Sequence, residues 1–127
     1  MSILETQLAD LKAQPGCADA EVQLVPDGSA IITIPNVTLP TGWSKSATTI
    51  RFVAPVGYPH AKPDCFWADT DLRLQSNAMP QATNITPIPG TDLSNLWFSW
   101  HTMHWDPNRD SLTTYLNVVR QRFKEPK

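Results

Sequence analysis

Apolar residues recur at helical spacing near both ends of the chain, and these two stretches predict helices. Residues 2–14 open with Ser2 to Glu5, the Ser-x-x-Glu form of a capping box, in which each side chain satisfies a free backbone N–H of the first turn. The apolar stripe that follows consists of Leu4, Leu8 and Leu11. Pro15 and Gly16 then end this helix.

A second helix is predicted from Asp110, whose carboxylate can cap the free N–H groups of a first turn. Its apolar stripe consists of Leu112, Tyr115, Leu116, Val119 and Phe123. Basic residues near its C-terminal end oppose the helix macrodipole, namely Arg120, Arg122 and Lys124. This is the clearest helix pattern in the chain.

Alternating and β-branched residues between the two helices predict strands. Residues 21–25 and 29–34 flank a Pro-Asp-Gly turn signal and together predict a hairpin. Residues 48–54 predict a third strand, and residues 66–74 a fourth. In the fourth strand, Trp67 lies opposite a set of residues that share one face, namely Phe66, Ala68, Thr70 and Leu72.

The stretch from residue 75 to residue 95 loses this periodicity and collects the breakers Pro80, Pro87, Pro89 and Gly90. We predict a long irregular segment there, of the kind that is usually functional or mobile. The fold class is therefore α+β, with an N-terminal helix, a four-stranded antiparallel meander, the irregular segment and a C-terminal helix. A chain of 127 residues suits one hydrophobic core, so we assign residues 1–127 to a single domain.

Composition and charge exclude several function classes. A net charge of -2 gives no electrostatic footprint for nucleic acid or for an anionic membrane. No apolar run reaches the roughly 18 residues that cross a bilayer, and residues 1–14 lack the basic and apolar regions of a signal peptide. Cys17 and Cys65 are too few for a disulfide framework. We therefore expect a soluble cytoplasmic protein with reduced thiols, no nucleic-acid partner and no membrane partner.

Two local motifs resemble the E2 (ubiquitin-conjugating) fold. Tyr58-Pro59-His60-Ala61-Lys62-Pro63 looks like the Tyr-Pro-x-x-x-Pro turn between the third and fourth strands of E2 proteins, in which two prolines of fixed φ stiffen the crossing. Trp105-Asp106-Pro107, ahead of the helix from Asp110, resembles the Trp-x-Pro element that leads into the E2 crossover helix. The resemblance implies an E2/UBC-like fold.

Longer stretches are similar to one bacterial branch, prokaryotic E2 family E. They are residues 39–42, 57–67, 98–101 and 105–116, within a resemblance that runs from about residue 20 to about residue 124. This resemblance implies a role beside three partners in a bacterial conjugation pathway. The partners are a ubiquitin-like protein, an E1-like activating enzyme and a JAB-type peptidase.

The chain departs from ordinary E2 proteins at the catalytic centre. Those proteins carry a cysteine a short distance before the Trp of Trp-x-Pro, but that position falls near Trp97 here and no cysteine follows Cys65. Thioester formation needs a thiolate, so ordinary E2 chemistry has no nucleophile at this position. The His-Pro-Asn triplet of E2 proteins is also absent from residues 75–95, and Lys12 is the one basic residue of the first helix.

Histidines are the candidate catalytic groups. His101 matches a histidine of the family E pattern and is a candidate general base or positioning group, because imidazole titrates near neutral pH; His104 is a second candidate. In the alternative interpretation, both rings fill an aromatic cluster. His101 and His104 together could share a metal ion, but zinc would need a third ligand. His60 or Asp106 would supply that ligand only by a coincidence of the fold, so we predict no metal site and no cofactor.

Cys65 and the aromatic residues complete the set of candidates. Cys65 is interpreted as a buried structural cysteine, and as a displaced nucleophile it would need an adjacent base, of which His60 is the nearest in sequence. The aromatic residues of 97–105 are too many to point inward together, and exposed tryptophans anchor protein interfaces. The candidate partner-binding residues are Trp97, Trp100, Trp105 and Tyr58.

Three functional hypotheses follow from these patterns. The first is a catalytically inactive, cysteine-less adaptor that binds a ubiquitin-like protein or an E1-like enzyme. The second is an active conjugating enzyme that uses His101 or a displaced Cys65. The third is an RWD-type protein interaction domain with no tie to ubiquitin-like proteins.

Overall fold

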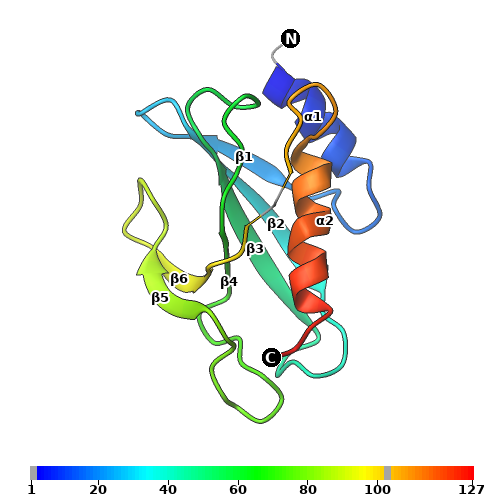
Figure 1. The fold of residues 1–127 in the computed structure, drawn as a ribbon, viewed down its shortest axis with the longest axis vertical. Coiled ribbons are helices and arrows are strands. Elements are labelled where there is room, and N and C mark those ends of the chain that lie inside the picture. Colours follow the sequence, from blue (N-terminus) through cyan, green and yellow to red (C-terminus); the bar gives the residue numbers. More distant parts are fainter. Residues whose placement is uncertain (1–2, 102–103) are drawn as a thin grey trace.

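The computed structural model describes residues 3–101 and 104–127, in which two helices pack on one face of an antiparallel sheet (Figure 1). Along the chain the elements are α1 (Ile3–Lys12), β1 (Glu21–Leu24), β2 (Ala30–Thr38), β3 (Ala47–Ala54), β4 (Phe66–Ala68), β5 (Thr83–Pro87), β6 (Ser94–Phe98) and α2 (Leu112–Phe123). The strands are ordered β1-β2-β3-β4-β6-β5 across the sheet. Neither helix is long and apolar enough to cross a membrane. The predicted α+β class, with a helix before and after the sheet, is confirmed.

The helix that follows the Trp-x-Pro motif begins later than predicted. Its N-cap is Ser111, not Asp110, because the Ser111 backbone is extended and its hydroxyl accepts a hydrogen bond from the Thr114 N–H. Thr114 returns the bond through its Oγ1, which accepts from the Ser111 N–H at 3.0 Å. Asp110 instead accepts from the Asp106 N–H at 2.7 Å. For α1, Ser2 of the predicted capping box lies outside the described residues.

The predicted hairpin is present as β1 and β2, with Val22 opposite Ile32 in the register. Strand β2 continues to Thr38, beyond the predicted end at Ile34, because an irregularity between Ile34 and Val37 lets pairing with β3 resume. The fourth strand is shorter than predicted. It ends at Ala68, because the Asp69 N–H donates to Thr48 Oγ1 rather than to a strand carbonyl.

The prediction of one long irregular segment over residues 75–95 is wrong, and within the described residues the sheet has six strands rather than four. Strands β5 and β6 pair in this region with Ile85 opposite Leu96, and β6 also pairs with β4. The prolines of this segment favoured an irregular structure, but they do not exclude a strand here because β5 lies at the edge of the sheet. An edge strand tolerates Pro87 at its end, where the missing N–H breaks no inner ladder.

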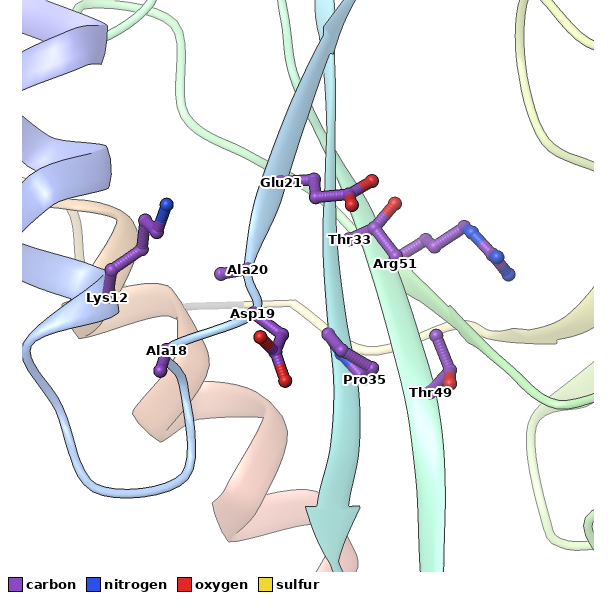
Figure 2. Close-up of a pocket in the computed structure, with 9 residues that line it drawn as sticks. All are labelled: Lys12, Ala18, Asp19, Ala20, Glu21, Thr33, Pro35, Thr49 and Arg51. Atoms are coloured by element: carbon purple, nitrogen blue, oxygen red, sulfur yellow. The ribbon is translucent and has the colours of Figure 1, made fainter.

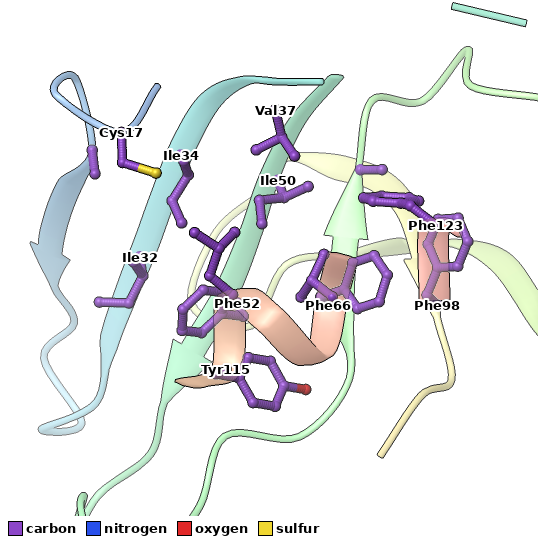
Figure 3. Close-up of a cluster of buried hydrophobic side chains, with 14 of the residues drawn as sticks. Cys17, Ile32, Ile34, Val37, Ile50, Phe52, Phe66, Phe98, Tyr115 and Phe123 are labelled. Atoms are coloured by element: carbon purple, nitrogen blue, oxygen red, sulfur yellow. The ribbon is translucent and has the colours of Figure 1, made fainter. Parts of the chain in front are cut away.

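The main core lies between the sheet and the two helices, and Figure 3 shows the part of it that lies beside α2. The rings of Phe66 and Phe98 stack with centroids 4.7 Å apart, and Phe123 meets the edges of both. The alternation predicted for β4 is confirmed, since Phe66 and Ala68 enter this core. Trp67 enters a smaller cluster with Ile31 and Ile88.

A buried arginine closes one end of this core. Arg122 of α2 is almost fully buried, and its guanidinium donates to the carbonyl oxygens of Gln81, Glu125 and Lys127 at 2.7–3.1 Å. The same group lies over three aromatic rings, those of Trp43, Phe98 and Trp100, at 5.2–5.8 Å from their centroids. Arg122 therefore ties α2 to the segment before β5 and to the final residues.

Candidate functional site

The two E2-like motifs, far apart in the sequence, lie against each other in the fold. Trp105 Nε1 donates a hydrogen bond to the Pro59 carbonyl oxygen at 2.8 Å, across 46 residues of chain. The Tyr58 and Trp105 rings are tilted against each other with centroids 6.1 Å apart. The proline bend between β3 and β4 and the segment that leads into α2 thus form one wall.

Gln7 joins this wall to the N-terminal helix. Its Oε1 accepts hydrogen bonds from the Tyr58 hydroxyl and from the Leu112 N–H, which is one of the free donors at the start of α2. Sequence analysis missed Gln7. The sequence does mark it, because Gln7 is a polar residue at helical spacing between Leu4 and Leu11, on the apolar face of the predicted helix.

Replacing Gln7 with alanine is expected to lower the free energy of unfolding by about 1–3 kcal/mol, because it leaves a buried N–H of α2 without an acceptor. Tyr58→Phe removes only the donor hydroxyl and is expected to cost about 1 kcal/mol. Urea unfolding measures both values. Asp10→Ala, at an exposed position of the same helix, is the control and should change stability by less than about 0.5 kcal/mol. Equal midpoints for Gln7→Ala and Asp10→Ala would contradict this role.

A cluster of three chemically active side chains lies where β4 begins and β6 ends. The donor atoms of Asp64, Cys65 and His101 all lie within 4.8 Å of one another. His101 Nδ1 contacts the Asp64 carboxylate, which orients the imidazole ring. The two segments are joined by the Cys65 N–H, which donates to the Trp100 carbonyl at 3.0 Å.

The Cys65 backbone has an uncommon conformation at this point. Its φ of 59° lies in the left-handed region, which non-glycine residues seldom adopt. The Tyr115 hydroxyl of α2 donates to the Cys65 carbonyl at 2.7 Å, so a buried hydrogen bond holds the strained residue. Strain of this kind is commonly retained at functional positions.

The electrostatics of the cluster keep the thiol protonated. Burial raises the pKa of Cys65 above its usual value, and the nearby Asp64 charge raises it further. Cys65 is 8% exposed, in agreement with the buried cysteine predicted from sequence. The neighbouring imidazole is that of His101 rather than His60, which was the nearest histidine in sequence. Chemically, the group can hold a metal ion, or His101 can accept the Cys65 proton.

The other residues singled out from sequence lie at several places in the fold. His104 is exposed. Trp97 belongs to β6 and lies opposite Trp67 in the register. It packs against the smaller apolar cluster of Ile31, Trp67 and Ile88, on the sheet face away from the helices. Trp100 lies against Arg122. All four aromatic candidates, Tyr58, Trp97, Trp100 and Trp105, are partly buried.

Two of the surface hollows lie beside α1. A polar hollow of about 490 Å³ lies between the end of α1 and strands β1 to β3. Its charged lining residues are Lys12, Asp19, Glu21 and Arg51 (Figure 2). It contains none of the candidate catalytic or partner-binding residues. A second, more apolar groove of about 620 Å³ lies between α1 and β1 and includes Tyr58. That groove is therefore continuous with the wall formed by the two motifs.

The helix-flanked antiparallel sheet, with a proline bend docked on the Trp-x-Pro segment, defines an E2-like domain. The family model of prokaryotic E2 family E matches residues 17–125, and the chain belongs to this family. Membership gives the protein an E2-like role in bacterial ubiquitin-like pathways. No curated protein and no solved structure matches the chain.

Proposed function

We propose that this protein is a catalytically inactive, E2-like adaptor that binds a ubiquitin-like protein or an E1-like enzyme without forming a thioester. The observation that carries the proposal is the position of Trp97, where ordinary E2 proteins place the catalytic cysteine. Trp97 lies within β6, and the backbone of β6 pairs with β4 on one side and β5 on the other. A paired inner strand offers no free loop on which to present a nucleophile.

Exposed apolar side chains support a protein partner. Leu24 is 74% exposed and Ile3 is 48% exposed, and both line the apolar groove between α1 and β1. Val56 of the proline bend is also exposed. Adjacent exposed apolar residues of this kind are typical of interaction sites. We propose this groove as the docking surface, with Tyr58 at its inner wall and with Trp97, Trp100 and Trp105 as further partner-binding residues.

The adaptor should form no covalent adduct when it is incubated with the cognate E1-like enzyme, the ubiquitin-like protein and ATP, then run on a non-reducing gel. Calorimetry with the same proteins should detect binding. Leu24→Asp is expected to weaken that binding by about 10-fold or more, because it places a charge in an apolar contact. Leu93→Asp, which adds the same charge at an exposed residue outside the groove, is the matched control.

A second candidate function is favoured by the Asp64–Cys65–His101 cluster. In this alternative, His101 removes the Cys65 proton and the thiolate attacks the thioester carbonyl carried by the E1-like enzyme. The new sulfur–carbonyl bond forms at Cys65, the bond to the E1 cysteine breaks, and that sulfur takes up the proton. A reductant-sensitive adduct that disappears in Cys65→Ser would establish this enzyme and overturn the adaptor. Failure to bind either pathway protein would favour the RWD-type interaction domain.

A further inference from the structure

We propose that Asp64, Cys65 and His101 bind one zinc ion, with water as the fourth ligand. These residues supply one carboxylate oxygen, one sulfur and one imidazole nitrogen, the three donor types that zinc takes from proteins. The proposal concerns a ligand that the adaptor function does not require. It is therefore tested independently of any protein partner.

The separation of the donor atoms suits the ion. Zinc bonds of about 2.0–2.3 Å in a tetrahedron place ligand atoms about 3.3–3.8 Å apart. The three donor atoms here lie within 4.8 Å of one another, so side-chain rotations that move them by about 1 Å complete the site. The Cys65 N–H and the Trp100 carbonyl, 3.0 Å apart, already hold the two segments together.

The backbone of Cys65 is consistent with a ligand position. Its left-handed φ of 59° turns two successive residues, Asp64 and Cys65, toward the same histidine. A regular strand would direct neighbouring side chains to opposite faces. The Tyr115 hydroxyl and the Cys65 carbonyl, 2.7 Å apart, keep this conformation.

Charge and exposure also fit a zinc site with an open position. The Asp64 carboxylate and a Cys65 thiolate together carry two negative charges, which one Zn²⁺ neutralises. Cys65 lies on the buried side, whereas the side chains of Asp64 and His101 are each 54% exposed. Solvent therefore reaches the position that the water would occupy. A zinc-bound Cys65 sulfur is also withheld from acyl transfer, in agreement with an adaptor.

The chain supplies matched controls for both reactive residue types. Cys17 is the other cysteine, and it is buried in the main core, where its sulfur contacts the Pro15 carbonyl at 3.8 Å. His60 is an exposed histidine that is not part of the cluster. Cys17→Ala and His60→Ala thus remove a thiol and an imidazole without touching the proposed ligands.

The experiment is a zinc titration of the reduced, metal-free full chain in competition with a chromophoric chelator. We expect one zinc per chain, with affinity reduced by about 10-fold to 100-fold or more in Cys65→Ser and His101→Ala, a smaller reduction in Asp64→Ala, and no change in the two control variants. Cobalt added to the unmodified chain should give a thiolate-to-metal charge-transfer band, which needs no variant to fold. The band should survive Cys17→Ala. Absence of stoichiometric binding, or binding that Cys65→Ser and His101→Ala leave unchanged, would overturn the proposal.

Discussion

Phe98→Ala is expected to lower the free energy of unfolding by about 3–5 kcal/mol, one of the two largest effects of any single substitution considered for this protein. Phe98 is fully buried at the end of β6 and contacts the rings of Phe66, Phe123 and Trp43. Removing its ring leaves a cavity that three large, mutually fixed side chains cannot fill. The loss includes the transfer free energy of the ring and the contacts around the cavity.

Urea unfolding followed by tryptophan fluorescence measures this effect. Ile85→Ala is the matched control, because Ile85 lies in the neighbouring strand β5 and is an exposed large apolar residue. It should lower stability by less than about 1 kcal/mol. A domain of this size is commonly stable by about 5–15 kcal/mol, so Phe98→Ala is expected to remove a large share of the total stability. A loss no greater than that of Ile85→Ala would show that the ring cluster is not the centre of the core.

Arg122→Ala is the second substitution with a large expected effect, a loss of about 3 kcal/mol. The guanidinium is the donor for three carbonyl oxygens, those of Gln81, Glu125 and Lys127. Alanine removes this donor from the Gln81 and Glu125 carbonyls, whereas the Lys127 oxygen keeps a hydrogen bond from the Gln81 N–H at 2.9 Å. It also removes the cation from the rings of Trp43, Phe98 and Trp100. Burial lowers the pKa of Arg122, but a guanidinium stays protonated at neutral pH. The buried positive charge must therefore be stabilised by the carbonyl oxygens that accept its hydrogen bonds.

Two variants separate charge from geometry in this prediction. Arg120→Ala removes a cation from the same helix at a partly exposed position and should change stability by less than about 0.5 kcal/mol. Arg122→Lys keeps the positive charge but loses the planar fork that serves several carbonyls at once, so it should also destabilise. Thermal unfolding of the three variants gives the comparison. An Arg122→Lys protein as stable as the unmodified chain would show that charge alone matters there.

Much of the fold follows from local patterns in the chain. The leucine stripe of α1, the stripe of α2 and the hairpin of β1 and β2 were predicted because each depends on neighbours in sequence. The proline bend and the Trp-x-Pro motif indicated the family because they resemble two motifs of E2 proteins. The prediction failed for the segment that contains β5 and β6, which was expected to be irregular. Its strands are stabilised by pairing with each other and with β4, which no local pattern reports.

Sequence patterns predicted two residues of the candidate site but not which residues lie together in the fold. His101 and Cys65 were both singled out, but the base expected beside Cys65 was His60, the nearest in sequence. The sheet instead brings the end of β6 to the start of β4, which places His101 against Asp64 across 37 residues. Gln7 was overlooked for a similar reason, since its hydrogen-bond partners lie 51 and 105 residues away.

The sequence by itself determined the helices, the stiff bend, the family and the absence of a cysteine at the usual catalytic position. These features depend on residue identity and on spacings of a few residues, so they do not depend on the tertiary structure. Only the tertiary structure decided which thiol, carboxylate and imidazole meet. Their meeting depends on strand order, and strand order follows from the burial of the whole apolar surface rather than from any single segment.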